Sequence, residues 1–378
     1  MNYSFEEKLY IWLSNVFECS AVSAHALVDA NGGIVELYEA VRKGTEIFPN
    51  RISLEKREKL RLLAPIQQID DFISGLESNC VRALTFASDD YPELLKCIYD
   101  PPLVLYSRGC GDINNMSLPF AIIGSRNCTD YGESMSALFG ETLARNGFTI
   151  VSGLAYGCDA MASVGALKAD GNPLPTVAVL GQGVCVDKND STARTMNKIL
   201  ERGLVLSELL PHSRAFKGSY PMRNRIISGL SQGLLVVEAG LRSGTMITAN
   251  AAMEQGRMVF ALPGRITDRM SQGTNQMLKN GAAQAVYGTD DILEYFGITD
   301  ISYEKNNRAA SEDNAVKNLS TSAKKLYLAL QKGERPFDTL CETTGITAAE
   351  LNSYLTEMEL MGLITQLPGR VYTAKSKL

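Results

Sequence analysis

The spacing of apolar residues changes along this chain, and each change predicts a different kind of structure. Over residues 1–72 apolar side chains recur every three or four positions, which predicts short amphipathic helices at 6–17, 21–30 and 34–43. From about residue 119 to 298 the pattern becomes short apolar runs that alternate with helical stretches. The last sixty residues return to the helical spacing.

The central apolar runs predict a sheet. They lie at 121–123, 149–151, 176–180, 204–206, 234–237, 258–262 and 285–287. Uninterrupted runs of Val, Ile and Leu between helices are typical of strands that are buried on both faces of a parallel sheet. We therefore predict an α/β fold with a doubly wound, mostly parallel sheet.

Composition shifts divide the chain into five parts. A helical module at 1–72 is followed by an extension at 73–118, which is rich in turn signals and leads into the sheet. The sheet domain covers 119–298, and a polar, aperiodic linker follows at 299–317. The last part, 318–378, forms a separate small domain.

The pattern of this last part predicts a winged helix. Helices are expected at 322–331 and 337–343, and a third begins with the capping-box pair Thr347 and Glu350 and runs to about 361. Two short strands, 363–365 and 370–373, flank Pro368 and Gly369. Three helices followed by a hairpin are the order of a winged helix, a variant of the helix-turn-helix.

Composition and charge exclude several classes. The 378 residues are 45% hydrophobic and 21% charged, so the chain is neither disordered nor fibrous. No apolar stretch is long enough to span a membrane, and the first ten residues lack a secretory pattern. Eight cysteines without a CxxC pair and only two histidines argue against zinc. We expect a cytoplasmic protein with reduced thiols, no metal and no membrane association.

Glycine-rich loops follow the predicted strands. Because ligands bind beyond the carboxyl ends of parallel strands, these loops should share one edge of the sheet. Glycine allows backbone N–H groups to approach a ligand, and a helix N-terminus such as that expected at 243–245 attracts an anion. The residues that we expect to bind an anion-bearing ligand from these loops are Gly124, Ser125, Arg126, Ser152, Gly153, Gly240, Ser243, Gly244 and Thr245.

The segment 211–231 combines cations with aromatic rings and has no acidic residue. Cations beside exposed rings are what single-stranded nucleic acid requires, since charges bind phosphates and rings stack with unpaired bases. The chain has a net charge of −5, but the window 211–270 holds eight basic and three acidic residues, a net +5, which leaves −10 elsewhere. Binding is therefore expected to be confined to a groove. Its candidate residues are Arg214, Phe216, Lys217, Tyr220, Arg223 and Arg225.

A structural role is the alternative for two of these cations. Arg223 and Arg225 can pair with carboxylates such as Glu208 and Glu238 beneath the pocket, and we expect this for at least one of the two. Motifs of common enzymes are missing: 181–186 lacks the third glycine of the dinucleotide fingerprint, and no P-loop or Ser/His/Asp set is present. No catalytic residue is therefore assigned.

Seven ordered sequence blocks resemble the DNA-processing protein A family, also called DprA or Smf. They are Ile123–Arg126, Ser152–Asp159, Ser207–Glu208, Tyr220–Ser231, Val237–Gly240 with Ser243–Thr245, Pro263–Gly264 and Gly273–Ala282. The resemblance implies an extended Rossmann-like domain between an N-terminal helical, SAM-like module and a C-terminal winged helix. It also implies DNA contacts by Arg126, Lys217 and Tyr220, with Arg223 and Asn224 in the same motif.

The resemblance further implies a homodimer without cofactor or catalysis. Such proteins bind and protect single-stranded DNA and load the RecA recombinase on it during natural transformation. Two parts of the chain depart from this picture. The turn at 17–20 lacks the Gly-x-Gly hairpin that holds a DNA backbone, so the helical module is not expected to bind DNA. The third helix of the winged helix carries three Glu and no Lys or Arg, which favours protein contact or a structural role.

An enzyme is the alternative reading. The same kind of sheet and loops resembles the lysine-decarboxylase-like group, whose members cleave nucleoside monophosphates with a glutamate in the loop Pro-Gly-Gly-x-Gly-Thr-x-x-Glu. Here Thr248 stands at the position of that glutamate. The carboxylate needed for acid–base catalysis is therefore missing from the loop.

Overall fold

The computed structural model describes residues 3–49, 52–187, 191–298, 319–331, 333–360 and 363–374. The linker predicted at 299–317 lies outside the described residues. The chain forms two compact units, Met1–Thr289 and Asp290–Leu378, and each is described by itself.

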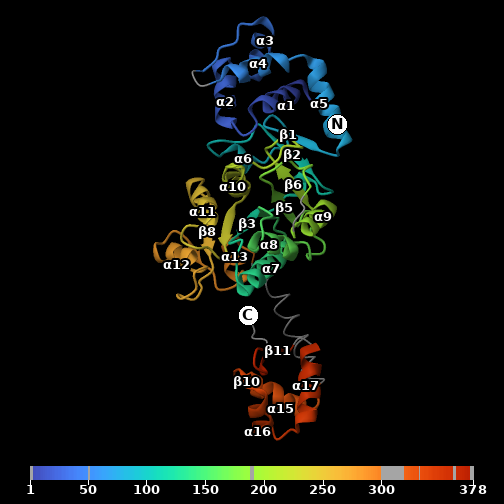
Figure 1. Ribbon diagram of the computed structural model, residues 1–378, viewed down its shortest axis with the longest axis vertical. Helices are drawn as coiled ribbons and strands as arrows, with labels where there is room; N and C mark the ends of the chain where they lie inside the picture. The colour runs from blue at the N-terminus through green and yellow to red at the C-terminus, as the bar shows by residue number, and fades with distance from the viewer. Residues whose placement is uncertain are drawn as a thin grey trace. The chain divides into compact units, whose positions relative to one another are not determined.

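The first unit begins with five helices that pack against one end of the sheet (Figure 1). They are α1 (Phe5–Phe17), α2 (Ala21–Ala30), α3 (Ile34–Lys43), α4 (Leu54–Leu62) and α5 (Ile66–Ser78). The three helices predicted from the apolar spacing are confirmed within one residue. The module shares a hydrophobic core with the sheet, and the Ser14 hydroxyl lies 2.8 Å from the hydroxyl of Tyr106 on the sheet. Helices and sheet therefore fold as one body.

The sheet has nine strands in the order β1-β2-β6-β5-β4-β3-β7-β8-β9. They are β1 (Arg82–Thr85), β2 (Val104–Arg108), β3 (Phe120–Ile123), β4 (Ile150–Ser152), β5 (Thr176–Val179), β6 (Leu204–Ser207), β7 (Gly233–Val236), β8 (Met258–Ala261) and β9 (Gln284–Ala285). The strands from β6 to β9 pair in parallel, whereas β1–β2 and β2–β6 pair antiparallel. The predicted α/β fold with a mostly parallel sheet is confirmed.

The segment 73–118 does more than lead into the sheet, because it supplies the strands β1 and β2. Both strands are short, and β1 (Arg82–Thr85) mixes polar with apolar residues, so the sequence pattern did not mark them. They continue the sheet beyond β6, where the helical module packs against them.

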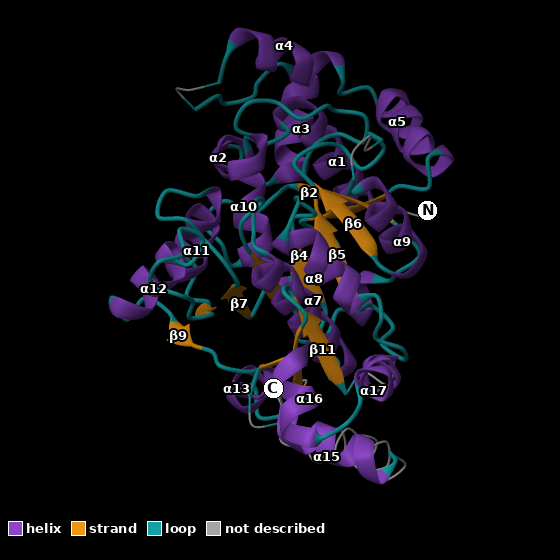
Figure 2. Cartoon of the chain, turned by 60° about the horizontal axis from the view of Figure 1, so that its bottom comes forward, coloured by secondary structure: helices purple, strands orange, loops and turns teal. Residues whose placement is uncertain are grey.

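Helices cover both faces of the sheet, as a doubly wound fold requires (Figure 2). The connecting helices are α6 (Glu93–Lys96), α7 (Asp130–Arg145), α8 (Cys158–Ala166), α9 (Ala193–Arg202), α10 (Ser219–Leu230), α11 (Gly244–Glu254) and α12 (Gln272–Lys279); α13 (Thr289–Tyr295) follows the last strand and is not among them. The chain runs outward from β3 through β4 and β5 to β6, and α10 then leads back to β7 on the other side of β3. This reversal beside β3 is the topological switch point, where such sheets bind ligands.

The second unit has the elements of a winged helix. They are α15 (Thr321–Leu330), β10 (Arg335–Pro336), α16 (Phe337–Thr344), α17 (Ala348–Leu360), β11 (Ile364–Leu367) and β12 (Val371–Ala374). The predicted capping box is present, since Thr347 N donates to Glu350 Oε2 and Glu350 N donates to Thr347 Oγ1. Glu350, Glu357 and Glu359 of α17 are exposed. The role of this helix stays a prediction.

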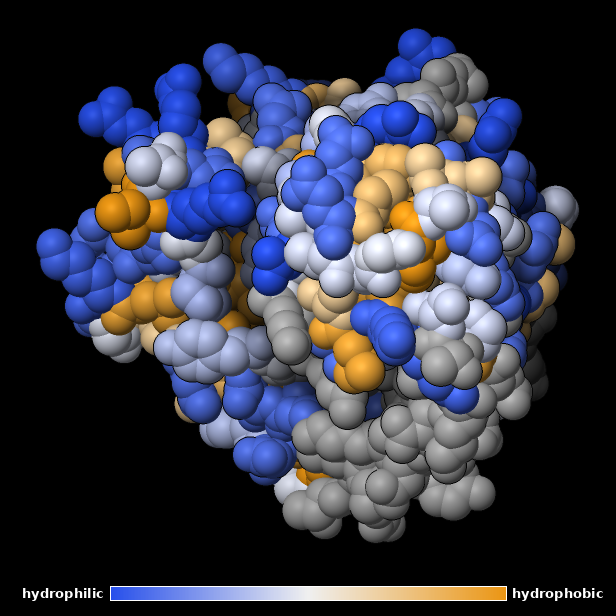
Figure 3. All heavy atoms as spheres, turned by 90° about the horizontal axis from the view of Figure 1, so that it is seen from below, coloured by the Kyte–Doolittle hydropathy of each residue, from blue (hydrophilic) through white to orange (hydrophobic). Residues whose placement is uncertain are grey.

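The surface is mixed. Apart from the residues drawn in grey, the face in Figure 3 shows hydrophobic side chains as small patches among hydrophilic ones. In the part of the chain that the structure describes, no helix is long and apolar enough to cross a membrane.

Candidate nucleic-acid interface

The loops after β3, β4 and β5 meet the start of α10 at the switch point. Gly124–Arg126 follows β3, and the loop after β4 turns sharply at Leu154, which adopts a left-handed backbone with φ of 49°. A non-glycine residue in this region indicates a backbone held by its surroundings. The network that holds these loops is centred on Asp159 at the start of α8.

Asp159 is a buried carboxylate that ties two of the glycine loops together. Its Oδ1 accepts from the Gly124 N–H at 3.3 Å, and its Oδ2 accepts from the Gly153 N–H at 3.1 Å. Arg223 of α10 lies against it, and its Nη1 donates to the carbonyls of Gly153, at 2.6 Å, and Val179. Burial raises the pKa of the Asp159 carboxyl, while the Arg223 charge opposes that rise. The pair organises the loops from beneath.

Arg223 is therefore a structural cation. It is buried, and burial lowers the pKa of its guanidinium to about 10, while Asp159 opposes the shift. A group with this pKa is still charged at neutral pH. Gly153 has to be glycine, because a Cβ there would lie 2.6 Å from Asp159 Oδ2 and 2.7 Å from Arg223 Cζ.

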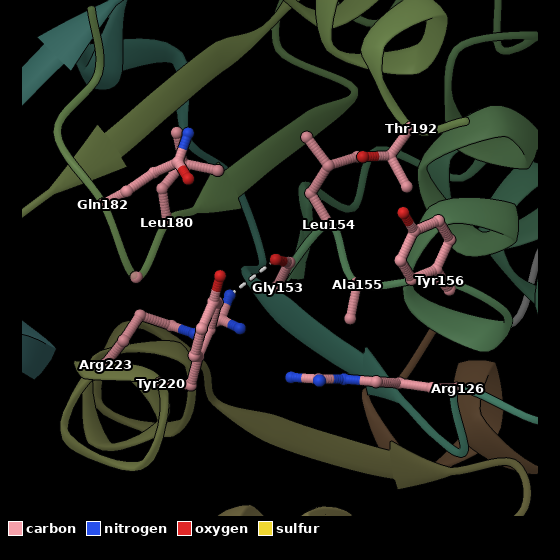
Figure 4. A pocket seen from close by; sticks show the side chains of 11 residues that line it. Arg126, Gly153, Leu154, Ala155, Tyr156, Leu180, Gln182, Thr192, Tyr220 and Arg223 are labelled. Atoms are coloured by element: carbon pink, nitrogen blue, oxygen red, sulfur yellow. Dashed lines mark hydrogen bonds between the residues drawn. The ribbon is translucent and has the colours of Figure 1, made fainter. Parts of the chain in front are cut away.

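Above this pair, Arg126 and Tyr220 meet at the surface. The guanidinium carbon of Arg126 lies over the Tyr220 ring, 5.3 Å from its centroid. Figure 4 shows the ring nearly edge-on, with the guanidinium beside it and Tyr156 across the cavity. Both side chains are exposed, Tyr220 to 40%. A cation and a ring are thus presented together at the carboxyl edge of the sheet.

Two cavities flank this pair, and Arg126, Ala155, Tyr220 and Arg223 line both. The smaller cavity, about 70 Å³, is also lined by residues of the loops after β4 and β5, among them Gly153, Tyr156 and Gln182. The larger one, about 400 Å³, extends from the Gly124–Asn127 loop to the N-terminus of α11. A ligand at this edge can therefore extend to both sides of the Arg126–Tyr220 pair.

The N-terminus of α11 gives the larger cavity a positive character. Ser243 precedes the helix in an extended conformation and makes no side-chain capping bond. Its Oγ is shielded from solvent and lacks a hydrogen-bond partner among the described residues. Gly244 and Thr245, in the first turn, line the same cavity. Free N–H groups and the helix dipole at such a terminus favour a phosphate.

The predicted site residues fall into two groups. Ten line one or both cavities: Gly124, Ser125, Arg126, Gly153, Tyr220, Arg223, Asn224, Ser243, Gly244 and Thr245. Four do not: Ser152, Lys217, Arg225 and Gly240. Ser152 is buried and donates its hydroxyl to the carbonyl of Ile122. Lys217 is exposed on the loop that leads into α10. Contact of these residues with DNA stays a prediction.

Arg225 forms ion pairs with two carboxylates. Its Nε lies 2.9 Å from Asp100 Oδ2, and its Nη2 lies 2.6 Å from Glu208 Oε2. The predicted pairing with Glu208 is therefore confirmed, and two carboxylates hold this side chain within the fold. Glu238, the other expected partner, instead accepts from the N–H and the hydroxyl of Thr129. Both carboxylates are committed within the fold.

Two residues near the pair were missed as site components. Asp159 lies within the block Ser152–Asp159 that resembles the family, but nothing in the sequence shows that it faces Arg223. Tyr156 is 44% exposed and lines the smaller cavity, and an aromatic residue inside a glycine loop was a signal that could have identified it.

Of the residues that the structure describes, one carboxylate and no glutamate line the larger cavity. Thr248, which replaces the catalytic glutamate of the nucleotide-cleaving group, lines the larger cavity. The carboxylate lining that cavity, Asp159, accepts two backbone N–H groups and faces Arg223. Among the described residues no group of three His, Cys, Asp or Glu side chains could hold a metal ion.

Comparison with known proteins identifies the family. Residues 82–297 match the model of DNA recombination-mediator protein A, and residues 310–370 match the DprA winged helix domain. The chain belongs to the DNA recombination-mediator protein A family. Protein Smf of Escherichia coli is 36% identical over 321 residues, which are 84% of each chain. The DNA processing protein DprA of Streptococcus pneumoniae is 38% identical over 229 residues, 60% of this chain and 79% of its own length.

Two solved structures share this architecture. The X-ray structure of DNA processing protein A from S. pneumoniae matches with a TM-score of 0.58 and 31% identity, over 75% of this chain and 97% of that one. DNA processing protein A from Helicobacter pylori, solved for its unique single-stranded DNA binding mode, matches with a TM-score of 0.51 and 29% identity. The latter match covers 57% of this chain and 95% of that one.

Proposed function

We propose that this protein binds single-stranded DNA at the carboxyl edge of its sheet, without catalysing a reaction. The observation that carries the proposal is the exposed Arg126–Tyr220 pair between two cavities, with glycine loops and the N-terminus of α11 around it. The single-stranded DNA binding of the H. pylori relative supports it. An exposed ring accepts any base, since every base has a π face, so binding should tolerate different sequences.

In this proposal the two sides of the pair have different tasks. Phosphates occupy the larger cavity, where Arg126 and the first turn of α11 supply charge and N–H donors. A base that is free of stacking partners meets the ring of Tyr220. Lys217 and Phe216, both exposed on the preceding loop, extend the path with a further cation and ring. A duplex keeps its bases stacked inside and cannot use the rings.

The proposed biological role follows from the family. We infer that the protein acts in the cytoplasm as a homodimer, protects single strands such as those taken up in natural transformation, and promotes loading of RecA on them. The family's description as a recombination mediator supports the RecA part. The test is recombinase activity on single strands already coated by a competing single-strand-binding protein. RecA-dependent ATP hydrolysis should start sooner when this protein is added, and an unchanged lag would contradict the role.

A titration of oligo-dT and of duplex DNA across salt tests the DNA proposal. Single strands should bind more tightly, and Tyr220→Ala should weaken binding by about 1–3 kcal/mol for one stacked base. Lys217→Ala should make the logarithmic salt slope shallower by about 0.7, the value for one phosphate of a single strand. The control is Lys59→Ala, an exposed lysine on α4, which should leave the slope unchanged. Tighter binding of duplex would overturn the proposal.

The enzyme alternative has its own test. Incubation with nucleoside monophosphates should release no base, because Thr248 replaces the catalytic glutamate. Base release at a rate that depends on protein concentration would show that the site performs chemistry.

A further inference from the structure

One face of the Tyr220 ring is closed by the backbone. A Cβ at position 181 would lie 2.7 Å from Cδ1, 3.1 Å from Cε1 and 3.3 Å from Cγ of this ring. Three neighbouring ring atoms at such similar distances place Gly181 against the face of the ring. No base can therefore enter on this side, and Gly181 is the residue that lets the ring lie so close to the loop after β5.

The opposite face carries the guanidinium of Arg126, with Cζ 5.3 Å from the centroid (Figure 4). Among the described residues no carboxylate forms an ion pair with Arg126. Arg223, beneath the pair, carries a like charge that reaches Arg126 electrostatically. The ring is thus the partner of Arg126 as long as no anion is present, and it is a partner that an anion can replace.

We propose that Arg126 is a gate over Tyr220, which a phosphate opens so that a base can stack on the ring. This inference rests on the proposed binding of single-stranded DNA. When a phosphate enters the larger cavity, the charge-assisted hydrogen bonds that it offers are stronger than the contact with the ring. Arg126 moves to the phosphate, and the uncovered face receives the neighbouring base.

The gate makes binding specific for single strands. A base without a phosphate meets a covered ring, and a duplex offers phosphates but no unstacked base. Only a single strand brings both groups together, so Arg126 and Tyr220 determine specificity as a unit. Gly181 is the positioning residue, because it fixes which face of the ring is available.

A double-mutant cycle for oligo-dT binding tests the gate through the sign of its coupling. Opening the gate breaks the contact between cation and ring, and either single substitution already removes that contact. Arg126→Ala loses the phosphate contact, and Tyr220→Ala loses the base contact, but neither single variant has to break the cation–ring contact on binding. Each single loss of affinity is therefore smaller by the free energy of that contact. The double variant gains this free energy once, whereas the sum of the two single variants counts it twice. It should therefore lose about two- to fivefold more affinity than the product of the two single losses, the factor that an exposed cation–π contact contributes.

Two results would overturn the gate. If the affinity loss of the double variant equals the product of the two single losses, the two side chains act independently. A loss smaller than the product would show that the guanidinium stays on the ring in the complex, with the base stacked on both. The control cycle combines Arg126→Ala with Lys217→Ala and should be additive. Both substituted side chains are exposed, and equal melting temperatures confirm that the variants fold.

The cycle also separates this inference from the proposed function. If wild-type protein does not bind oligo-dT, the proposed function and the gate both fail. If wild-type protein binds and the coupling is absent or reversed, only the gate fails.

Discussion

Replacing Asp159 by asparagine changes one atom and should destabilise the whole first unit. The two carboxylate oxygens accept from the N–H groups of Gly124 and Gly153, and asparagine offers only one acceptor. One buried N–H then faces an amide NH₂, which costs about 1–3 kcal/mol. Arg223 also loses its counter-charge. We therefore expect a loss of about 1–3 kcal/mol, the cost of the unsatisfied N–H.

Urea unfolding followed by tryptophan fluorescence measures this loss. The chain has a single tryptophan, Trp12, which is buried in α1 and shares the hydrophobic core of the sheet. Its signal therefore follows the unit that contains Asp159 and not the winged helix. With a slope of up to about 3 kcal/mol per molar urea, a loss of 1–3 kcal/mol lowers the midpoint by at least about 0.3 M.

The matched control is Asp170→Asn, an exposed aspartate in the same unit that lies 3.8 Å from Arg202. It should shift the midpoint very little, because exposed ion pairs contribute about 0–1 kcal/mol. If Asp159→Asn shifts the midpoint no more than this control, the Asp159–Arg223 pair does not organise the loops. Loss of the loop geometry should also weaken oligo-dT binding.

Three further substitutions test other parts of the site. Gly181→Ala should weaken oligo-dT binding without changing its salt slope, because the new Cβ would lie 2.7 Å from the ring of Tyr220 and displace it; an unchanged dissociation constant would refute the contact. Arg225→Ala should lower the free energy of unfolding by about 3–5 kcal/mol, since it leaves Glu208 and Asp100 without their cation, and a shallower salt slope would instead make Arg225 a DNA contact. Burial raises the pKa of Glu208 to about 7 from an ordinary value near 4.5, so the folded protein holds this proton more tightly than the unfolded chain does, and the wild type should lose stability as pH rises from about 4.5 to 7. Glu208→Gln should lack this loss. Parallel pH profiles of the two proteins in urea unfolding would contradict the prediction.

The apolar pattern predicted the helices and strands whose residues are apolar because they are buried. The helices α2 and α3 and the strands from β3 to β8 lie where the apolar spacing placed them, within one or two residues. The strands β1 and β2 were missed because each is short and lies among the turn signals of the segment 73–118, and β1 mixes polar with apolar residues. The edge of the sheet thus became visible only through its pairing with β6.

The sequence by itself determined that glycine loops, cations and aromatic rings belong to one sheet edge, because parallel strands bring their carboxyl ends together. It could not assign a task to each cation. Arg223 and Arg225 lie in the same motif as Tyr220, yet one is buried against Asp159 and the other lies between Asp100 and Glu208.

Only the tertiary structure decided which cation meets the ring. Arg126 follows β3 and Tyr220 begins α10, and the long return of the chain across the switch point brings them into contact. The local sequence pattern indicates which residues are buried and the spacing at which they recur. A contact such as that between Arg126 and Tyr220 depends instead on how the fold brings together segments that are distant in the sequence. Whether a cation is buried or exposed, and which group it contacts, therefore depends on residues that lie close to it in the fold but far from it in the sequence.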